Sequence, residues 1–411
     1  MADLPLSDVK VLDLTRLLPG GFCSLLLADL GAEVLKVEDT GMGDYIRWAP
    51  PYYGGEEQQA LGTRSSLYLS LNRGKRSVRL DLKSERGKEA LLRLVAAYDV
   101  VLDGFRPGVL DRLGVGYERI REENPQIVFC AITGYGQDGP YAQRAGHDMN
   151  YLGLVGLLGL TGTKDGPPVQ SAGQIADLGG GGLMAAFGVM AALHERQRSG
   201  EGQMVDISMA DGALSWLAMV AGRYFCDEEV PRRGEQQLAG GLVCYLPYEA
   251  SDGWVTCGAL EPKFWAALCN GVGRSDLIEK QFEAPGSESW GEIAAVFRSR
   301  SRDEWLAFND EHDCCIEPVL DLDEALDSEL VKARGMVVEL DQPELGKVRQ
   351  LGNPVRFSRT PADPTRPAPA FGEHTDEVLA DLGYSAEEIA AMKESGAAAG
   401  PTADAQGEFR A

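Results

Sequence analysis

One histidine and one aspartate are the residues of this sequence best suited to moving a proton, and each lies next to a glycine-rich segment. His147 lies in AGHDMNY, residues 145–151, and is one of four histidines in the protein. Asp177 lies in IADLGGGG, residues 175–182, before an apolar helical stretch. A histidine and a carboxylate that face one small substrate from two sides form a pair able to transfer a proton. We therefore predict an acid–base pair of His147 and Asp177, with a buried histidine.

Each of these residues also has a purely structural explanation. A lone histidine with few charged neighbours, such as His147, is ordinarily a core residue satisfied by its surroundings. Asp177 precedes a helix predicted to start at 178–180, so its carboxylate could simply cap that helix. A helix start also stabilises a developing anion, with N–H groups near Gly179–Gly182 as the expected donors. The adjacent Asp148, the glycine-rich flanks and Asp177 itself favour the catalytic explanation for His147.

Positive charge is concentrated in NRGKRSVRLDLK, which carries Arg73, Lys75, Arg76, Arg79 and Lys83. In a chain of net charge −24, such a cluster suits phosphate groups, although a solvated basic surface explains it equally well. Arg106 follows a predicted strand end, where an anion-binding residue would be useful, and Lys36 is a weaker candidate by the same reasoning. Glu261 precedes Pro262 at a predicted helix start, where a negative charge is favourable in itself.

The elements that must position these residues alternate along the first part of the chain. Strands are predicted at 9–15, 32–39, 77–82, 99–105 and 126–133, and helices at 22–31, 83–98, 107–114 and 117–124. This alternation predicts an open parallel α/β sheet, whose ligands bind at the carboxyl ends of its strands. The turn after the first strand carries Pro19-Gly20-Gly21 and not GxGxxG, which argues against a dinucleotide site. Segment 41–66 has no periodicity and is expected to be a long surface loop.

A second, smaller α+β domain is predicted from a change of pattern later in the chain. A hairpin with Asp252-Gly253 at its turn precedes amphipathic helices at 261–271, 289–299 and 302–312. The predicted bounds are 1–207 for the large α/β domain, 208–240 for a linker, 241–325 for the small domain, and 326–411 for a return linker with the C-terminal part of the large domain.

Composition narrows the class of partner and the compartment. The chain has 63 acidic against 39 basic residues, which argues against a nucleic acid or an anionic membrane as partner. The eight cysteines have no metal-binding spacing and are expected to be reduced thiols of a cytosolic enzyme. Residues 1–10 carry acids and a proline where a signal peptide needs an apolar stretch, and no apolar run is expected to reach the roughly 20 residues of a membrane span. We expect a cytoplasmic location.

Considered together, these segments resemble the family III CoA-transferases, the CaiB/BaiF superfamily, over nearly the whole chain. The shared motifs are VKVLDLTRLLPGGFCSLLLADLGAEVLKVE, NRGKRSVRLDLK, DGFRPGVLDRLG, ITGYGQDGP, RSGEGQMVDISMADG and FGEHTDEVLADLGY. Within the superfamily, AGHDMNY and GALEPKFW look like the corresponding blocks of the α-methylacyl-CoA racemases. The transferases usually have another sequence in the first block and rely on the aspartate that matches Asp177.

The resemblance implies a fold and a set of site residues. The fold would be a large Rossmann-like open parallel-sheet domain plus a smaller α+β domain, in an interlocked homodimer. His147 would be a proton-transfer base, with Glu261 orienting it. Contacts to the CoA substrate would fall on Leu80, Asp81, Leu82, Lys83, Arg106, Gly146, Asp148, Met149, Asn150 and Tyr151. Two features depart from the racemases: Asp39 replaces an arginine that often follows the second strand, and the long 41–66 segment is more like the transferases.

The sequence therefore predicts a racemase of 2-methyl-branched acyl-CoA thioesters in lipid metabolism. One of His147 and Asp177 would remove the α-proton, and the other would return a proton to the opposite face of an enolate. No metal or separate cofactor is expected, because coenzyme A is part of the substrate. The alternatives are a CoA-transferase in which Asp177 attacks the thioester as a nucleophile, and a CoA-binding module without enzymatic activity.

Overall fold

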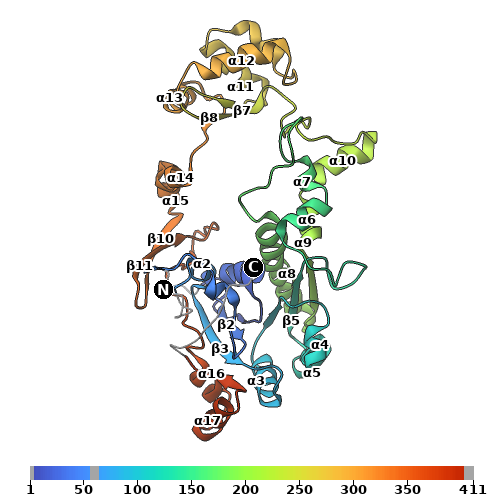
Figure 1. The fold of residues 1–411 in the computed structure, drawn as a ribbon, viewed down its shortest axis with the longest axis vertical. Coiled ribbons are helices and arrows are strands. Elements are labelled where there is room, and N and C mark those ends of the chain that lie inside the picture. Colours follow the sequence, from blue (N-terminus) through green and yellow to red (C-terminus); the bar gives the residue numbers. More distant parts are fainter. Residues whose placement is uncertain (1–3, 56–63, 402–411) are drawn as a thin grey trace. The chain divides into compact units, whose positions relative to one another are not determined.

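The computed structural model describes residues 4–55 and 64–401. The chain forms two compact units (Figure 1). The first unit consists of Met1–Leu152, Gly173–Ser215 and Lys332–Ala411, and the second of Gly153–Ala172 and Trp216–Val331. The predicted small domain, 241–325, lies within the second unit.

The first unit is built on a seven-stranded sheet with the order β12-β3-β2-β1-β4-β5-β6. Its strands are β1 Lys10–Asp13, β2 Glu33–Glu38, β3 Lys75–Leu80, β4 Val100–Asp103, β5 Val128–Thr133, β6 Met204–Ser208 and β12 Ala398–Ala399. All neighbours pair in parallel except β12, which runs antiparallel to β3 at the edge. The order 3-2-1-4-5-6 is that of a Rossmann-like sheet, in which ligands bind where the order reverses between β1 and β4. The prediction of an open, mostly parallel sheet is confirmed.

Helices and one hairpin surround this sheet. They are α1 Leu17–Asp29, η1 Tyr45–Trp48, α2 Ser66–Asn72, α3 Glu85–Val95, α4 Val109–Leu113, α5 Tyr117–Glu123, η3 Ile175–Leu183, α8 Met184–Ser199, α9 Met209–Ser215, β10 Val337–Gln342, β11 Gly346–Leu351, α16 Thr375–Asp381 and α17 Ala386–Glu394. Helix α6, Asp148–Leu154, begins in this unit. Ser84 caps the start of α3, because its side chain accepts a hydrogen bond from the Gly87 N–H at 3.1 Å.

The central strands are buried on both faces, as parallel strands covered by helices must be. In β1, Val11 belongs to the same apolar cluster as Leu27 of α1 and Val189 of α8. Its neighbour Leu12 belongs to a second cluster with Leu91 of α3. Successive side chains of a strand point to opposite faces, so the core of this unit lies in two layers, one on each side of the sheet.

The second unit contains a three-stranded antiparallel sheet covered by helices. Its elements are α7 Leu157–Leu160, α10 Ala218–Asp227, β7 Tyr245–Glu249, β8 Trp254–Gly258, α11 Pro262–Gly271, η4 Ser275–Lys280, α12 Glu288–Arg298, α13 Arg302–His312, β9 Ile316–Pro318, α14 Leu322–Asp327 and α15 Glu329–Arg334, the last of which continues into the first unit. Strands β7 and β8 pair around Asp252-Gly253, which confirms the predicted hairpin.

Two sequence predictions in the first unit are wrong. Helix α1 begins at Leu17, so Pro19-Gly20-Gly21 lies within it and not in a preceding turn. Proline is tolerated so near the start because the first N–H groups of a helix have no partner within the helix. The expected surface loop 41–66 contains η1, in which Ile46, Arg47 and Trp48 are buried. Residues 56–63 of that segment lie outside the described residues.

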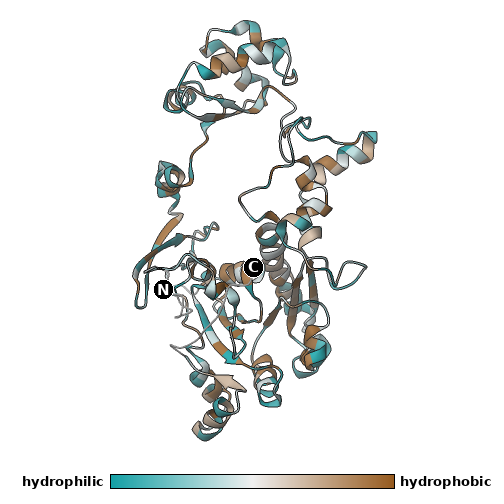
Figure 2. Cartoon of the chain, in the orientation of Figure 1, coloured by the Kyte–Doolittle hydropathy of each residue, from teal (hydrophilic) through white to brown (hydrophobic). Residues whose placement is uncertain are grey.

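One helical segment is long and apolar enough to span a membrane by length and composition, namely Ile175–Ser199, formed by η3 and α8 (Figure 2). This finding differs from the expectation that no apolar run reaches such a length. Half of its most apolar stretch is buried inside the first unit. Packing in a protein core gives the same composition as lipid contact, so the segment by itself is weak evidence for a membrane.

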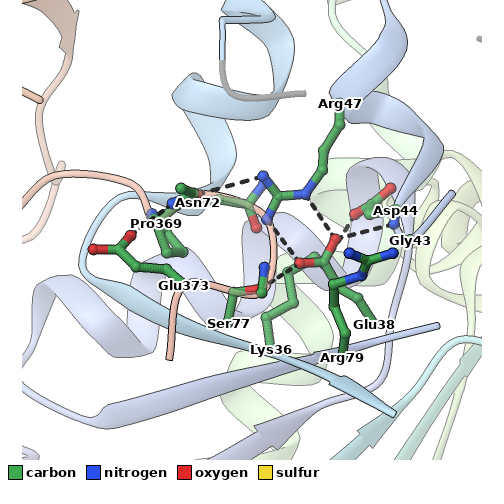
Figure 3. Close-up of polar contacts among 12 residues, drawn as sticks. Lys36, Glu38, Gly43, Asp44, Arg47, Asn72, Ser77, Arg79, Pro369 and Glu373 are labelled. Carbon is green, nitrogen blue, oxygen red and sulfur yellow. Dashed lines mark hydrogen bonds and ion pairs between the residues drawn. The ribbon is translucent and has the colours of Figure 1, made fainter. Parts of the chain in front are cut away.

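A network of buried charges ties η1 to β2 (Figure 3). The Arg47 guanidinium donates to both carboxylate oxygens of Glu38, at 2.7 Å each, and the Ser77 hydroxyl donates to Glu38 Oε2 at 2.7 Å. Lys36 Nζ lies 2.9 Å from Asp44 Oδ2. All five side chains are buried. Because a buried charge is costly without a partner, these ion pairs constrain the path of the chain after β2.

Candidate active site

The segment that carries His147 leads directly into α6. The His147 N–H donates to Asn150 Oδ1 at 3.0 Å, and its carbonyl oxygen accepts from the Asn150 N–H at 2.8 Å. These bonds are typical of the residue before a helix and fix the backbone there. His147 itself is exposed in the single chain. The expectation of a buried histidine, and with it the core explanation, is wrong for the chain by itself.

Asp177 lies in the first turn of η3, a π-helix that continues into α8. The Leu178 N–H donates to the Gln174 carbonyl oxygen at 2.9 Å, and Gln174 precedes the helix. The alternative explanation of Asp177 as the cap is therefore wrong. Burial raises the pKa of the half-buried Asp177 carboxyl to about 6, with a further contribution from the Asp148 carboxylate. A carboxyl with such a pKa can hold or release a proton near neutral pH.

Asp148 joins the His147 segment to the start of η3. Its carboxylate oxygen Oδ1 accepts hydrogen bonds from the Ala176 N–H at 2.6 Å and the Asp177 N–H at 3.0 Å. The side chain is only 2% exposed. These bonds satisfy two of the N–H groups that a helix start leaves without partners. The residue after His147 thus binds the backbone of Asp177, so the segments that carry the two predicted catalytic residues are joined at this point.

Tyr151 connects this site to the end of β4. Its hydroxyl donates to the Gly146 carbonyl oxygen at 2.6 Å, and its ring meets that of Tyr135 edge-on, with centroids 5.1 Å apart. Burial and the Asp177 carboxylate raise the pKa of Tyr151, whereas the Arg106 guanidinium lowers it. Arg106 is exposed and follows β4. The structure therefore brings the predicted anion-binding Arg106 into the neighbourhood of Tyr151.

The glycine run after Asp177 serves packing and not anion binding. Gly180, Gly181 and Gly182 are buried within η3. A Cβ at Gly182 would lie 2.6 Å from the Pro19 carbonyl oxygen of α1, and one at Gly180 would lie 2.7 Å from the Met209 carbonyl oxygen of α9. Only glycine permits these approaches of one backbone to another. The expectation that N–H groups here stabilise an anion is wrong for Gly180, Gly181 and Gly182, which are buried within the helix, and stays a prediction for the partly buried Gly179.

Most of the basic cluster on β3 is occupied by internal partners. Arg73 binds both carboxylate oxygens of Asp29, at 2.9 and 2.7 Å, and Lys75 Nζ lies 3.3 Å from Asp13 Oδ2. Arg79 donates to backbone carbonyl oxygens after β2, among them that of Gly41 at 3.2 Å. Arg73, Lys75 and Arg79 are buried. The interpretation of these residues as phosphate ligands is therefore wrong; they balance buried carboxylates and satisfy carbonyl groups.

The predicted CoA contacts around β2 and β3 differ in their access to a ligand. Lys36 is completely buried, with Nζ bonded to the Thr15 carbonyl oxygen at 3.0 Å as well as to Asp44. Leu80 is a core residue of β3. Asp81 and Leu82 are partly buried, and Lys83 is exposed. Lys36 and Leu80 thus present no side chain to solvent here, whereas Lys83 does.

The other predicted site residues are the CoA contacts on or near α6, and Glu261, which was predicted to orient His147. Gly146 is partly buried, Met149 and Asn150 are exposed, and Asn150 also holds the His147 N–H. Glu261 is an exposed residue of the second unit that precedes α11 without capping it through its side chain. Its role in orienting His147 stays a prediction.

The sequence interpretation missed Arg16, which follows the central strand β1. Arg16 follows β1, and its Nη2 lies 2.8 Å from Asp39 Oδ2 after β2. Its guanidinium lies 5.4 Å from the ring centroid of Phe105, which follows β4. These residues flank the reversal of strand order between β1 and β4. An arginine directly after the first strand of a βαβ unit is the signal that identifies it, and Asp39, the departure from the racemase pattern, is its partner.

The raised pKa of Asp177 predicts that Asp177→Asn stabilises the protein at alkaline pH. Above the folded pKa of about 6, Asp177 is ionised in both states, and its burial penalises the folded one. This penalty shrinks as pH falls from 6 towards the unfolded value of 3.8, and below that value the carboxyl is protonated in both states. We expect a gain on the order of 1–2 kcal/mol at pH 8, allowing for partial exposure, and about half of it at pH 5.

Urea unfolding of the wild type and Asp177→Asn at the two pH values measures this difference. The exposed Asp138, replaced by asparagine, is the matched control and should change the midpoint at neither pH. A gain that is equal at both pH values, or a loss at pH 8, would contradict the assigned titration.

Within residues 4–55 and 64–401, no three His, Cys, Asp or Glu side chains are grouped so as to hold a metal ion. The expectation of a reaction without metal or separate cofactor rests on the chemistry of the proton-transfer pair, and it stays an expectation.

Comparison with known proteins assigns the family. Residues 6–375 match CoA-transferase family III. The mouse protein named alpha-methylacyl-CoA racemase is 37% identical over 393 residues, 93% of this chain and 95% of that protein. The human succinyl-CoA:glutarate CoA-transferase is 33% identical over 386 residues, 92% of this chain and 86% of that protein. A crystal structure of a CaiB/BaiF family protein from Brucella suis superimposes with a TM-score of 0.80 at 31% identity, covering 92% of this chain and 100% of that one. The resemblance inferred from the sequence motifs is confirmed, and the chain belongs to CoA-transferase family III.

Proposed function

We propose that the protein is a racemase of 2-methyl-branched acyl-CoA thioesters. The observation that carries this proposal is the link between the two predicted catalytic segments: Asp148, next to His147, holds the backbone N–H of Asp177 at 3.0 Å. Asp177 has a pKa of about 6, close to neutral pH, so it can serve as acid or as base. The similarity to the mouse racemase supports the same activity.

The reaction requires two proton transfers at one carbon. In one direction His147 removes the α-proton, the electron pair moves into the thioester to form an enolate, and protonated Asp177 delivers a proton to the opposite face. In the other direction ionised Asp177 is the base and protonated His147 is the acid. Glu261, from its own chain or from a partner, is proposed to orient the imidazole.

CoA binding is proposed to rest on exposed groups at the carboxyl ends of the strands, above all Arg106 and Lys83, together with the exposed face of α6. Lys36 is withdrawn from this set because its ammonium is buried and paired. Binding the distant nucleotide part of CoA fixes the reacting carbon against the acid–base pair.

Arg106→Gln is expected to raise the KM for an acyl-CoA about tenfold while changing kcat less than about threefold, because a charge-assisted contact to a phosphate contributes to ground-state and transition-state binding alike. Steady-state kinetics measure this split. Arg112→Gln removes an exposed arginine of α4 and should leave both constants unchanged. An acyl-pantetheine thioester, which lacks the nucleotide, should show no penalty from Arg106→Gln; an equal penalty would contradict the phosphate contact.

We also propose a homodimer, which the family resemblance implies to be interlocked. Phe187 on α8 is 71% exposed in the single chain, and Met219 and Phe225 on α10 are 75% and 78% exposed. Apolar side chains exposed to this degree commonly mark a protein interface. Sedimentation should give twice the mass of one chain.

We also propose that the protein is a cytoplasmic enzyme of lipid metabolism and that it has no nucleic acid or membrane as a partner.

The second candidate is a CoA-transferase, favoured by the similarity to succinyl-CoA:glutarate CoA-transferase. Here the ionised Asp177 attacks the thioester carbonyl, releases CoA as a thiolate and forms a mixed acyl anhydride. The thiolate then attacks the Asp177 carbonyl, which releases the first carboxylic acid and leaves CoA on Asp177 as a thioester for the second acid to accept. Incubation of (S)-2-methylacyl-CoA with the protein alone separates the two. A racemase converts it to an equal mixture of both epimers at C2, as chiral chromatography shows. A transferase leaves its configuration unchanged and transfers CoA only when a second carboxylic acid is added.

A further inference from the structure

We propose that Asp148 is a positioning residue, whose buried carboxylate fixes the first turn of η3 and places a second negative charge beside Asp177. This inference rests on the proposed role of Asp177 in proton transfer. It assigns to the Asp148 side chain a function different from a contact to CoA, because a side chain that is 2% exposed has little surface left for a ligand.

The geometry shows how Asp148 holds the turn. One oxygen, Oδ1, accepts both the Ala176 and Asp177 N–H groups, at 2.6 and 3.0 Å. The other, Oδ2, is buried and has no hydrogen-bond partner among the described residues. One well-placed acceptor therefore orders the turn, whereas the second oxygen contributes negative charge without a compensating donor.

That charge acts on Asp177. A second carboxylate nearby disfavours ionisation, and after burial the Asp148 carboxylate is the other cause that raises the pKa of Asp177. Asparagine in place of Asp148 keeps an acceptor oxygen for the two N–H groups and removes the charge. Alanine removes both. The two substitutions therefore separate the ordering of the turn from its electrostatic effect.

Tyr151 of α6 is a second titratable group close to Asp177, whose carboxylate raises the pKa of Tyr151, whereas Arg106 lowers it. The other titratable groups near η3 have different partners. Asp211 of α9 couples to Asp206 of β6, and Cys23 of α1 couples to Cys130 of β5. The charged residues of α8 are His194, Glu195, Arg196 and Arg198, all in its C-terminal half. Among the described groups, Asp148 is thus the charge that most directly controls Asp177.

The test compares Asp148→Asn, Asp148→Ala and the exposed control Asp138→Asn. For Asp148→Asn, in the direction of the reaction in which ionised Asp177 is the base, we expect the acidic limb of the kcat/KM profile to move about one pH unit lower, with the plateau within about threefold of the wild type. For Asp148→Ala we expect kcat to fall at least about tenfold with little change in KM, because the turn is no longer held. Asp138→Asn should change neither quantity.

A second measurement needs no turnover. The carboxyl carbon of Asp177, assigned by its absence from Asp177→Asn, is titrated by ¹³C NMR in the wild type and in Asp148→Asn. A lower titration midpoint in Asp148→Asn supports the inference even if the wild type racemises nothing. The measurement therefore distinguishes a failure of this inference from a failure of the proposed racemase function. An unchanged or higher midpoint, or an Asp148→Ala variant with wild-type kcat, would overturn it.

Discussion

His147→Ala and Asp177→Asn are each expected to slow the racemisation of a 2-methylacyl-CoA by about 1,000-fold, with KM changed only a few-fold. A positioned acid or base typically contributes a factor of about 10²–10⁴, and each direction of the reaction needs both groups. Because the two residues act as one pair, the double variant should be little slower than either single variant. Chiral analysis of the recovered thioester, starting from each enantiomer, measures these rates.

The matched control is His194→Ala, which removes an exposed histidine of α8. It should racemise at the wild-type rate. The result also separates the two candidate reactions. In a transferase, Asp177→Asn abolishes turnover, but His147→Ala retains most of it, since the nucleophile needs no second base. A His147→Ala variant that racemises as fast as the wild type would contradict the assigned pair.

Asp13→Asn is expected to lower the free energy of unfolding by about 3–5 kcal/mol, the usual cost of breaking a buried ion pair from one side. Asp13 is completely buried at the end of β1. Its Oδ2 accepts from the Ser24 hydroxyl at 2.6 Å and lies 3.3 Å from Lys75 Nζ and 3.9 Å from Lys36 Nζ. Burial alone would raise the pKa of Asp13, but the two ammonium groups and its hydroxyl donors lower it to about 2.

Urea unfolding at pH 7 measures this loss, with the exposed Asp8→Asn as the control that should have no effect. The double variant Asp13→Asn/Lys75→Met should lose less free energy of unfolding than the two single variants lose together. In the double variant no buried ammonium group of Lys75 is left without its carboxylate partner. The contribution of Asp13 is present above the unfolded pKa of 3.8 and is lost as pH falls towards 2. Additive effects of the two substitutions would show that the ion pair contributes nothing to stability.

The sequence predicts the elements well where their signals are local. Helix 302–312 was expected from its periodicity and is found as α13, because the Ser301 hydroxyl and the Glu304 side chain form a capping box at its start. The parallel strands β1 to β5 are likewise predicted from short segments that contain valine, isoleucine or leucine. The start of α1 was missed, because proline and two glycines suggest a turn when their packing partners are unknown.

The candidate site is predictable only in part. His147 and Asp177 stood out by residue type and by their glycine-rich surroundings, and the structure joins their segments through Asp148. The phosphate interpretation of the β3 cluster failed, because a basic residue can pair with a carboxylate far away in the sequence. Arg73 and its partner Asp29 are separated by 44 positions. No local pattern shows whether such a side chain points towards solvent or into the core.

The measurement that tests the central claim most directly is α-proton exchange in deuterated water with (S)-2-methylacyl-CoA and no second acid present. A base that removes the α-proton and an acid that returns solvent hydrogen must incorporate deuterium at C2 as the configuration is lost. We expect exchange in the wild type and its loss in His147→Ala and Asp177→Asn. An absence of exchange, together with an acyl-enzyme that hydroxylamine traps on Asp177, would contradict the racemase and identify a transferase.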